Sequence, residues 1–267
     1  MISYLGQMLG YASGVRNLSD LRTQLKAVTG YAALARYLRR RYEPFNGFYT
    51  LSPDLLPALV KAFNIQIVQA QKGQDLLNGE VGYYEFGMFR GFSFWFAEQL
   101  AREYAPATFK FLGFDSFAGH PEPTLASEAA QFKQGDDCGS YEEVVANLNQ
   151  WGADRRRMQL YQGFYSTGFF NGILQRAADA ATPLPKISIC LIDVDLYISC
   201  APVLEFIKSL LCVGSILLFD DFNMFDAAND AGERRAFLEF SQRHPNISWE
   251  HRFNYGQHGA AFQVTEI

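Results

Sequence analysis

The chain has 267 residues, of which 49% are apolar, and it carries a formal net charge of −5. This length allows one large domain, or a core domain with a smaller extension, and a substantial buried core. The negative charge argues against a nucleic-acid-binding protein, which usually presents a basic face. No uninterrupted apolar run approaches the ~20 residues of a membrane span, so membrane insertion is not expected either.

The four cysteines and the first residues indicate the compartment. The cysteines show no Cys-x-x-Cys spacing, and three of them lie in apolar surroundings typical of a core. The chain starts without a basic segment followed by an apolar one, so secretion is not indicated. We therefore expect a reduced, cytoplasmic protein.

Residues 1–78 are predicted to form a helical N-terminal extension without a convincing strand. Ser52 and Pro53 are a favourable helix start, and the apolar residues after them recur at helical spacing. These residues are Leu56, Leu59, Val60, Phe63 and Ile67. The aromatic stretch at 42–49 is compatible with a lid over a pocket, a subunit contact or an ordinary packed loop. We expect the extension to act as a lid or to pair subunits in a homo-oligomer.

Residues 79–267 form the second predicted domain, in which strands alternate with helices. That order indicates an α/β fold with a mostly parallel sheet covered on both sides. The predicted strands cover residues 82–86, 109–114, 158–162, 187–192 and 215–219. The C-terminal segments 247–253 and 260–266 are predicted to form a hairpin that closes one edge of the sheet.

Two predicted helix starts carry the spacing of a capping box. Ser140 stands in this spacing with Glu143, and Asp230 stands in it with Glu233. An apolar helical face follows in both cases. We interpret Glu233 as part of this cap rather than as a reacting group.

The turn after the first predicted strand contains Gly87 and Gly91, and Glu85 precedes them. A strand, a tight turn and a helix in this order form the place where open α/β sheets bind nucleotides. The glycines would let the backbone come close to such a ligand. By itself this signal is weak, because a simple tight corner explains it equally well.

Asp115 follows the next predicted strand and is a candidate for accepting hydrogen bonds from ribose hydroxyls. The alternative is a role as a turn or helix cap, which the neighbouring Ser116 can also fill. The sequence lacks a complete Gly-x-Gly-x-x-Gly motif. A nucleoside ligand without a pyrophosphate is therefore favoured.

Four carboxylates follow the fourth and fifth predicted strands, namely Asp193, Asp195, Asp220 and Asp221. Asp193 and Asp195 are two residues apart, and in an extended chain such residues share a face. Adjacent parallel strands end at the ligand-binding edge of the sheet, so we expect all four carboxylates at one pocket. Their repulsion requires protons or a cation, and all-oxygen ligation favours Mg²⁺, Mn²⁺ or Ca²⁺.

Six motifs of the chain resemble those of the macrocin O-methyltransferase-like (TylF-type) family of class I S-adenosylmethionine-dependent methyltransferases. They are Glu-Phe-Gly-x-Phe-Arg-Gly (85–91), Gly-Phe-Asp-Ser-Phe-x-Gly-x-Pro (113–121), Gln-Gly-Phe-Tyr (162–165), Ile-Asp-x-Asp-Leu-Tyr (192–197), Phe-Asp-Asp (219–221) and Gly-Glu-Arg (232–234). The resemblance runs from about residue 79 to the C-terminus. It implies a Rossmann-like, seven-stranded, mostly parallel sheet flanked by helices.

The resemblance also implies which residues hold the ligands. The expected S-adenosylmethionine-binding residues are Glu85, Gly87, Gly91, Asp115, Ser116, Gly163 and Phe164. The expected ligands of Mg²⁺, or of another divalent cation, are Asp193, Asp220 and Asp221. Asp195 stands at the position of the general base, and Leu196 and Tyr197 follow it where some relatives have a histidine.

The leading hypothesis is a metal-dependent O-methyltransferase that acts on a small-molecule hydroxyl, with a sugar or glycoside as the favoured acceptor. A divalent cation would stabilise the attacking oxygen, and a carboxylate would take its proton. Tyr197 is compatible with substrate contact or with packing, and His120 and His258 are compatible with structural or helper roles. The alternatives are an NAD(P)-dependent oxidoreductase and a non-catalytic S-adenosylmethionine-binding or assembly protein.

Overall fold

The computed structural model describes residues 54–102, 105, 108–227 and 229–267. These residues form a seven-stranded sheet with the order β3-β2-β1-β4-β5-β7-β6. The strands are β1 (Val81–Phe86), β2 (Lys110–Asp115), β3 (Met158–Gln162), β4 (Lys186–Ile192), β5 (Ile216–Phe219), β6 (Ser248–Tyr255) and β7 (Gly259–Glu266). The sheet confirms the predicted Rossmann-like methyltransferase fold. The aromatic stretch at 42–49 lies outside the described residues.

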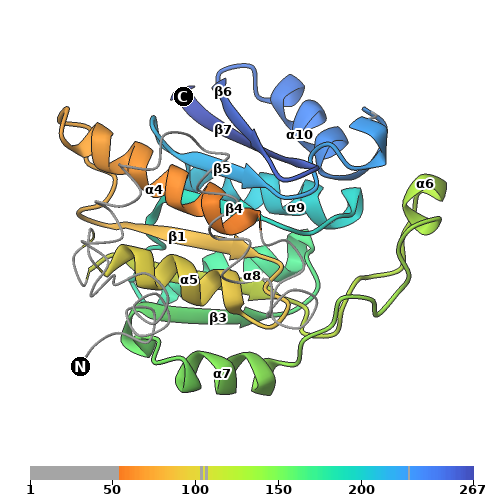
Figure 1. The fold of residues 1–267 in the computed structure, drawn as a ribbon, viewed down its shortest axis with the longest axis horizontal. Coiled ribbons are helices and arrows are strands. Elements are labelled where there is room, and N and C mark those ends of the chain that lie inside the picture. Colours follow the sequence, from red (N-terminus) through yellow and green to blue (C-terminus); the bar gives the residue numbers. More distant parts are fainter. Residues whose placement is uncertain (1–53, 103–104, 106–107, 228) are drawn as a thin grey trace, which may run out of the picture.

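Helices connect the strands and cover both faces of the sheet (Figure 1). They are α4 (Leu55–Ala70), α5 (Phe92–Ala101), α6 (Ala126–Ala129), α7 (Tyr141–Gln150), α8 (Thr167–Asp179), α9 (Tyr197–Ile207) and α10 (Gly232–Arg243). Short 3₁₀ turns lie at Arg155–Arg157, Lys208–Leu210 and Phe225–Ala227. Within the described ranges, no helix has both the length and the apolar character needed to cross a membrane.

The sheet is parallel except at one edge. β1 pairs in parallel with β2 and with β4, and β5 continues the parallel order beside β4. β7 lies antiparallel between β5 and β6, so the predicted C-terminal hairpin closes this edge. The strand order reverses between β1 and β4, which is the switch point where sheets of this kind bind ligands.

The alternation of side chains along each strand divides the core into two layers. Tyr83 of β1 and Phe111 of β2 face α4, α5 and α7, whereas the next residue of β1, Tyr84, faces the opposite side. Phe114 of β2 joins Tyr84 there, in a cluster with residues of α8, α9 and α10. Both layers are rich in aromatic rings. The central strands are apolar on both faces because each face is covered by one of these layers.

Helix α4 lies within the predicted N-terminal extension, and its predicted apolar face packs directly on the sheet. The residues of this face, Leu56, Leu59, Val60, Phe63 and Ile67, are all buried in the core cluster that contains Tyr83. Gln66 donates from Nε2 to the carbonyl oxygens of Ser188 (2.8 Å) and Gly214 (3.0 Å). These hydrogen bonds attach α4 to β4 and to the residues before β5.

The two predicted capping boxes have different outcomes. Ser140 accepts a hydrogen bond from the backbone N–H of Glu143 at 3.1 Å, so the cap of α7 is confirmed. The cap of α10 is wrong, because its N-cap residue is Ala231, whose side chain has no acceptor.

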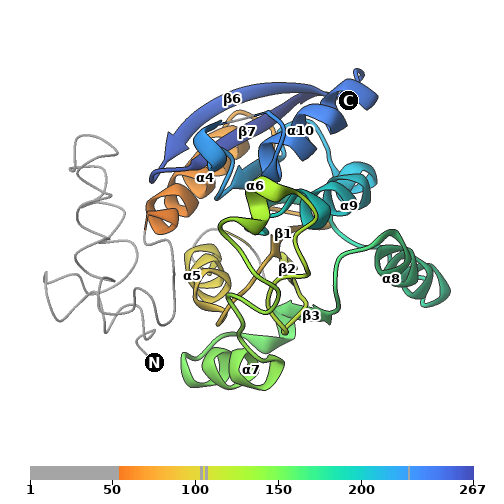
Figure 2. The same cartoon turned by 90° about the vertical axis from the view of Figure 1, so that its right-hand side faces the viewer.

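Residues 116–140, called the 116–140 segment below, connect β2 to α7 and carry the short helix α6. Figure 1 shows this segment reaching beyond the carboxyl ends of the strands. In Figure 2, which looks toward these ends, α6 lies near α9 and α10. The beginning and the end of this segment pair through the backbone of His120. The His120 N–H donates to the Asp136 carbonyl oxygen, and the His120 carbonyl oxygen accepts from the Gly135 N–H (both 3.0 Å).

Candidate active site

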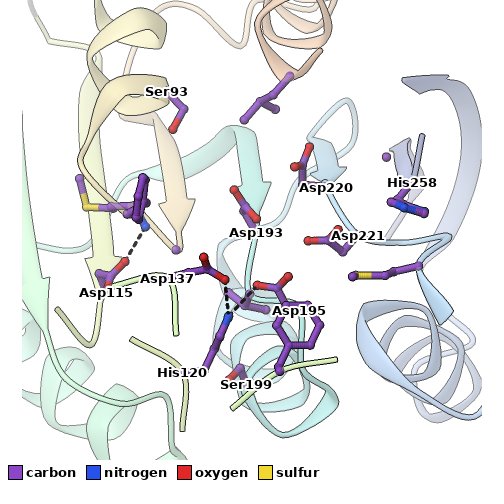
Figure 3. A pocket seen from close by; sticks show the side chains of 18 of the residues that line it. Ser93, Asp115, His120, Asp137, Asp193, Asp195, Ser199, Asp220, Asp221 and His258 are labelled. Carbon is purple, nitrogen blue, oxygen red and sulfur yellow. Dashed lines mark hydrogen bonds and ion pairs between the residues drawn. The ribbon is translucent and has the colours of Figure 1, made fainter. Parts of the chain in front are cut away.

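A cavity of about 770 Å³ lies at the carboxyl ends of the parallel strands. Residues from the turns after β1 to β5, from the 116–140 segment and from the β6–β7 turn line it. Figure 3 shows Asp115 on one side of this cavity and the acidic residues that follow β4 and β5 across from it. The glycine turn and the acidic cluster predicted from the sequence therefore face the same space.

Gly87 lines the cavity, but its closest neighbour is protein backbone. Its φ is +83°, and a Cβ built on it would lie 1.7 Å from the carbonyl oxygen of Asp193. The turn after β1 and the loop after β4 therefore touch at this point. The structure requires glycine here for the packing of two backbones, whereas the sequence had suggested ligand approach alone.

Gly91 and Glu85 support the glycine turn without lining the cavity. Gly91 is the N-cap of α5 with φ +81°. Glu85 is fully buried and accepts hydrogen bonds from the hydroxyls of Tyr83 (2.5 Å) and Ser93 (2.7 Å). Burial raises the pKa of Glu85 to about 8. Ser93 does line the cavity, so it connects Glu85 to this space.

Asp115 lines the cavity and also closes a turn. Its two carboxylate oxygens accept hydrogen bonds from the N–H groups of Met88 and Phe117, each at 2.6 Å. The backbone N–H of Phe89 also donates to this carboxylate. A carboxylate has about four acceptor positions, so one remains for a ligand and the two predicted roles are compatible. Burial raises the pKa of Asp115. The Ser116 hydroxyl lines the same wall and donates to the Gly119 oxygen at 2.7 Å.

The loop after β3 contributes an exposed aromatic ring. Phe164 lines the cavity with 47% of its surface exposed, and such a ring can stack on a planar ligand. Gly163 does not line the cavity. Tyr165 donates from its hydroxyl to the Phe114 oxygen (2.7 Å) and accepts from the Gly87 N–H (2.8 Å). It thereby ties this loop to the ends of β1 and β2.

All four predicted carboxylates line the opposite half of the cavity (Figure 3). Oxygens of Asp193, Asp195 and Asp221 lie within 4.8 Å of one another. The resemblance implied Asp193, Asp220 and Asp221 as the metal ligands, whereas this group contains Asp195 and not Asp220. Asp220 lines the same cavity outside the group. A set of carboxylate oxygens without nitrogen or sulfur suits a hard divalent cation.

The crowding of these carboxylates alters their acidity. Burial, together with the charges of Asp220 and Asp221, raises the pKa of Asp193 well above its usual range. Burial and the charges of Asp221 and Asp193 do the same to the pKa of Asp195. Carboxylate oxygens as close as those of Asp195 and Asp221 repel one another unless a proton or a cation lies between them. A divalent cation in this place would meet that requirement.

The expectation that Asp195 lies in extended chain is wrong. Its φ is 57°, in the left-handed region, because β4 already ends at Ile192. The following N–H, that of Leu196, donates to the Val194 oxygen at 2.5 Å and closes a tight turn. Asp195 therefore reaches the shared cavity through a turn and not through strand alternation.

Glu233 is the second residue whose role differs from the sequence interpretation. It is fully buried in the first turn of α10. Its carboxylate accepts from the N–H of Val194 (3.0 Å) and from the N–H of Asp221 (3.1 Å). The interpretation of Glu233 as a helix cap is therefore wrong, since its carboxylate joins the loops after β4 and β5.

Tyr197 packs on α10, and this decides between the two predicted roles of its side chain, substrate contact and packing. Its hydroxyl donates to Glu239 at 2.7 Å, and the Arg235 guanidinium lies 4.2 Å from its ring centroid. Tyr197 does not line the cavity. The packing alternative is the one that the structure supports.

His120, on the 116–140 segment, contacts the base candidate. Its Nε2 lies 3.1 Å from a carboxylate oxygen of Asp137 and 3.5 Å from one of Asp195 (Figure 3). Its ring packs edge-on against Phe132, with 5.0 Å between the centroids. His258 enters from the β6–β7 turn and also lines the cavity.

Comparison with known families decides between the functional hypotheses. The family model described as Macrocin-O-methyltransferase (TylF) matches residues 64–245, which is more than half of the chain. This chain belongs to the macrocin O-methyltransferase family. It is an O-methyltransferase, and the resemblance seen in the six motifs is confirmed. The matched region begins inside α4, earlier than residue 79, where the motifs placed it.

Solved structures with the same fold include two O-methyltransferases. NovP is 21% identical, with a TM-score of 0.58 over 77% of this chain and 80% of that chain. The calicheamicin methyltransferase CalS11 is 19% identical, with a TM-score of 0.55 over 78% of this chain and 77% of that chain. At these identities the likeness supports the fold. No curated protein sequence matches the chain.

Several cavity residues of this O-methyltransferase were not predicted as site residues. Ser93 carries no motif of its own, and His120 stands at an unassigned position of the motif at 113–121. Asp54 and Tyr255 reach the cavity from the start of α4 and from the end of β6. A Cβ on Gly256 would lie 3.2 Å from the Cβ of Asp54, so these distant segments meet. Only tertiary contact brings them to the site.

Proposed function

We propose that this O-methyltransferase transfers a methyl group from S-adenosylmethionine to a hydroxyl of a sugar or glycoside, with a divalent cation, in the first place Mg²⁺, at the acidic cluster. The observation that carries the proposal is the single cavity that contains both the glycine turn with Asp115 and the four carboxylates. Membership of the macrocin O-methyltransferase family supports the type of reaction.

The donor half of the site lies between the turn after β1 and the loops after β2 and β3. Asp115 accepts hydrogen bonds from the ribose hydroxyls, and Phe164 stacks on the adenine. Gly87 and Ser93 bound the end of the cavity that holds the methionine portion, with Glu85 behind Ser93. Gly91, Ser116 and Gly163 shape the loops that carry these contacts.

The acceptor half is the acidic cluster, with Asp193, Asp220 and Asp221 as the proposed cation ligands. Their shared cavity and the raised pKa of Asp193 fit a site that is completed by positive charge. When bound, S-adenosylmethionine supplies the methyl group on its sulfonium and the cation lowers the pKa of the acceptor hydroxyl.

Asp195 is the proposed general base. Methyl transfer forms an oxygen–carbon bond, breaks a sulfur–carbon bond and releases the hydroxyl proton, which Asp195 accepts. Its carboxylate lies beside Asp221, so a hydroxyl that is bound at the cluster is within reach of both. Proton acceptance by a positioned carboxylate typically contributes ~10²–10⁴ in rate.

A polar rim near the acidic cluster supports a hydroxyl-rich acceptor. Gln257 and His258 of the β6–β7 turn line the cavity together with Asp54 at the start of α4. These groups offer donors and acceptors for sugar hydroxyls. The solved structure of CalS11 is described as that of a TDP-rhamnose 3′-O-methyltransferase, and a sugar acceptor agrees with this description.

We propose that the extension at residues 1–78 closes the site or pairs two subunits beside the methyltransferase domain at 79–267, with its helix α4 packed on the sheet of that domain. We also propose a cytoplasmic location and no nucleic-acid partner. The net charge of −5 and four free cysteines, two of them buried in the core, agree with both.

The test separates the base from the cation ligands. Asp195→Asn should lower kcat by ~10²–10⁴ while leaving the Kd of S-adenosylmethionine unchanged. Asp193→Asn should weaken Mg²⁺ binding more strongly than Asp195→Asn does. Methyl transfer is measured by mass spectrometry over a panel of nucleotide-linked sugars and natural-product glycosides, and Mg²⁺ and S-adenosylmethionine binding by calorimetry. Full activity of both variants in EDTA would exclude the metal-dependent mechanism.

A further inference from the structure

Asp195 holds a backbone conformation that needs support from its surroundings. Its φ of 57° is unfavourable for a residue with a Cβ and persists where neighbouring groups fix it. The turn is tight, because the Leu196 N–H donates to the Val194 oxygen only two residues earlier. The groups that hold the two flanks of this turn therefore decide where the Asp195 carboxylate points.

Glu233 holds the flank that precedes Asp195. Its Oε1 accepts from the Val194 N–H at 3.0 Å, and its Oε2 accepts from the Asp221 N–H at 3.1 Å. The side chain is fully buried in the first turn of α10, where the helix dipole favours a carboxylate. A single side chain thus fixes Asp195 and Asp221 relative to each other.

Glu128 holds the flank that follows Asp195. This residue comes from α6 in the 116–140 segment and is fully buried. One oxygen, Oε1, accepts from the Tyr197 N–H at 2.8 Å and from the Gly232 N–H at 2.9 Å. Tyr197 and Gly232 are the first residues of α9 and α10, so Glu128 joins the starts of both helices to the 116–140 segment.

We infer that Glu128 and Glu233 are positioning residues that together hold the Asp195 turn in its reactive conformation. Neither of the two lines the cavity, so each acts through backbone N–H groups and not on the substrate. The inference rests on the proposed role of Asp195 as the base. It also gives the 116–140 segment a function, since the docking of α6 completes the support of the base.

The different use of the two carboxylates provides a sharp test. Glu233 uses both oxygens, so Glu233→Gln places an amide NH₂ against a backbone N–H and loses one of the two hydrogen bonds. Glu128 uses a single oxygen for both hydrogen bonds, and glutamine keeps such an oxygen. Glu128→Ala loses both bonds, and Glu128→Gln should recover most of what Glu128→Ala loses.

Glu98→Gln is the matched control. Glu98 is a fully buried carboxylate on α5 that accepts from the Arg102 Nε at 2.8 Å, and it does not line the cavity. The substitution removes a buried charge in the same domain without touching the Asp195 turn. Effects that appear in this variant report general destabilisation.

The first measurement needs no acceptor. Amide hydrogen exchange of the full chain, followed by NMR, should accelerate at Val194 and Asp221 in Glu233→Gln. In Glu128→Ala it should accelerate at Tyr197 and Gly232. Glu98→Gln should leave all four amides as in the parent protein. Unchanged exchange at these amides in the Glu233→Gln and Glu128→Ala variants would overturn the inference.

The second measurement separates positioning from stability. With the best acceptor from the glycoside panel, Glu233→Gln and Glu128→Ala should lower kcat by about 10²-fold, the usual effect of a 1 Å misplacement. The KM and the Kd of S-adenosylmethionine should not change, and Glu98→Gln should keep the parent kcat. Equal losses of kcat in Glu98→Gln, or kcat losses matched by weaker S-adenosylmethionine binding, would contradict positioning.

The kcat of Asp195→Asn distinguishes a failure of the proposed base from a failure of the positioning inference. If Asp195→Asn keeps its kcat, the proposed base is wrong and the inference falls with it. If Asp195→Asn loses kcat while Glu233→Gln and Glu128→Ala keep theirs, the proposed function stands and only the positioning inference is overturned.

Discussion

Gly87 lies where the turn after β1 meets the loop after β4, and this contact joins the two halves of the site. A Cβ would lie 1.7 Å from the Asp193 carbonyl oxygen, and this oxygen belongs to backbone that cannot rotate away. The same glycine has φ +83°, which is unfavourable for any other residue. One residue therefore fixes the distance between the donor half and the acidic cluster.

Gly87→Ala is expected to destabilise the protein by more than its backbone strain, which alone costs about 1–3 kcal/mol. Methyl transfer should fall as well, because the loop that carries Asp193 must move. Gly79→Ala is the matched control, since Gly79 has φ +88° and no heavy atom within 4 Å of an added Cβ. Urea unfolding and methyl-transfer rates of both variants check the prediction, and equal free-energy losses would contradict it.

At the scale of elements, the 116–140 segment is held against the acidic loops by side chains and not by sheet pairing. Phe132 is 9% exposed and contacts the rings of His120 and Phe225, at centroid distances of 5.0 and 6.2 Å. His120 in turn approaches Asp195, and Glu128 binds the starts of α9 and α10. The 116–140 segment therefore covers the acidic loops, and its contacts surround Asp195, the proposed base.

Phe132→Ala should loosen this cover while the sheet remains folded. Removing a buried phenylalanine ring typically costs about 3–5 kcal/mol, and here most of that loss weakens the docking of the segment. Limited proteolysis should cut within residues 116–140 faster than in the parent, and kcat should fall.

Phe169→Ala is the control for this change. Phe169 is a partly buried phenylalanine of α8 that contacts Phe170 and lies outside the cavity lining. It should shift the thermal midpoint without exposing the segment. Similar cleavage patterns in the two variants would show that the loosening is not specific to Phe132.

At the scale of the whole molecule, the site concentrates buried carboxyl groups that hold their protons more tightly than in an unfolded chain. Burial raises the pKa of Glu85 to about 8 and raises the pKa of Asp193, Asp195 and Glu233 well above the usual range. Each such group stabilises the fold below its unfolded pKa, and this contribution is lost as pH rises through the folded pKa.

The free energy of unfolding of the ligand-free protein should therefore fall as pH rises from about 5 to 8, by about 1.4 kcal/mol for each unit of pKa shift. Glu85→Gln should flatten this dependence, since Glu85 has its folded pKa at about 8. Mg²⁺ should offset the loss most strongly at the alkaline end, where the cluster is ionised. Urea titrations at several pH values, with Mg²⁺ or EDTA, measure this, and stability that rises with pH would refute it.

The sequence by itself determined the order of strands and helices, because their apolar periodicity and turn residues act over a few neighbouring positions. It also determined which loops carry Asp115 and the four carboxylates, since residues that follow adjacent parallel strands meet at one edge. The cap of α7 by Ser140 was predictable for the same local reason.

Only the tertiary structure decided what depends on distant segments. Glu233 fits a cap by spacing, yet its carboxylate binds the N–H groups of Val194 and Asp221. Asp195 follows a strand, yet its φ of 57° belongs to a turn that Glu128 and Glu233 support from two other elements. A buried carboxylate accepts hydrogen bonds from the donors that the fold places beside it. Those donors belong to segments distant in the sequence, so residue spacing does not predict them.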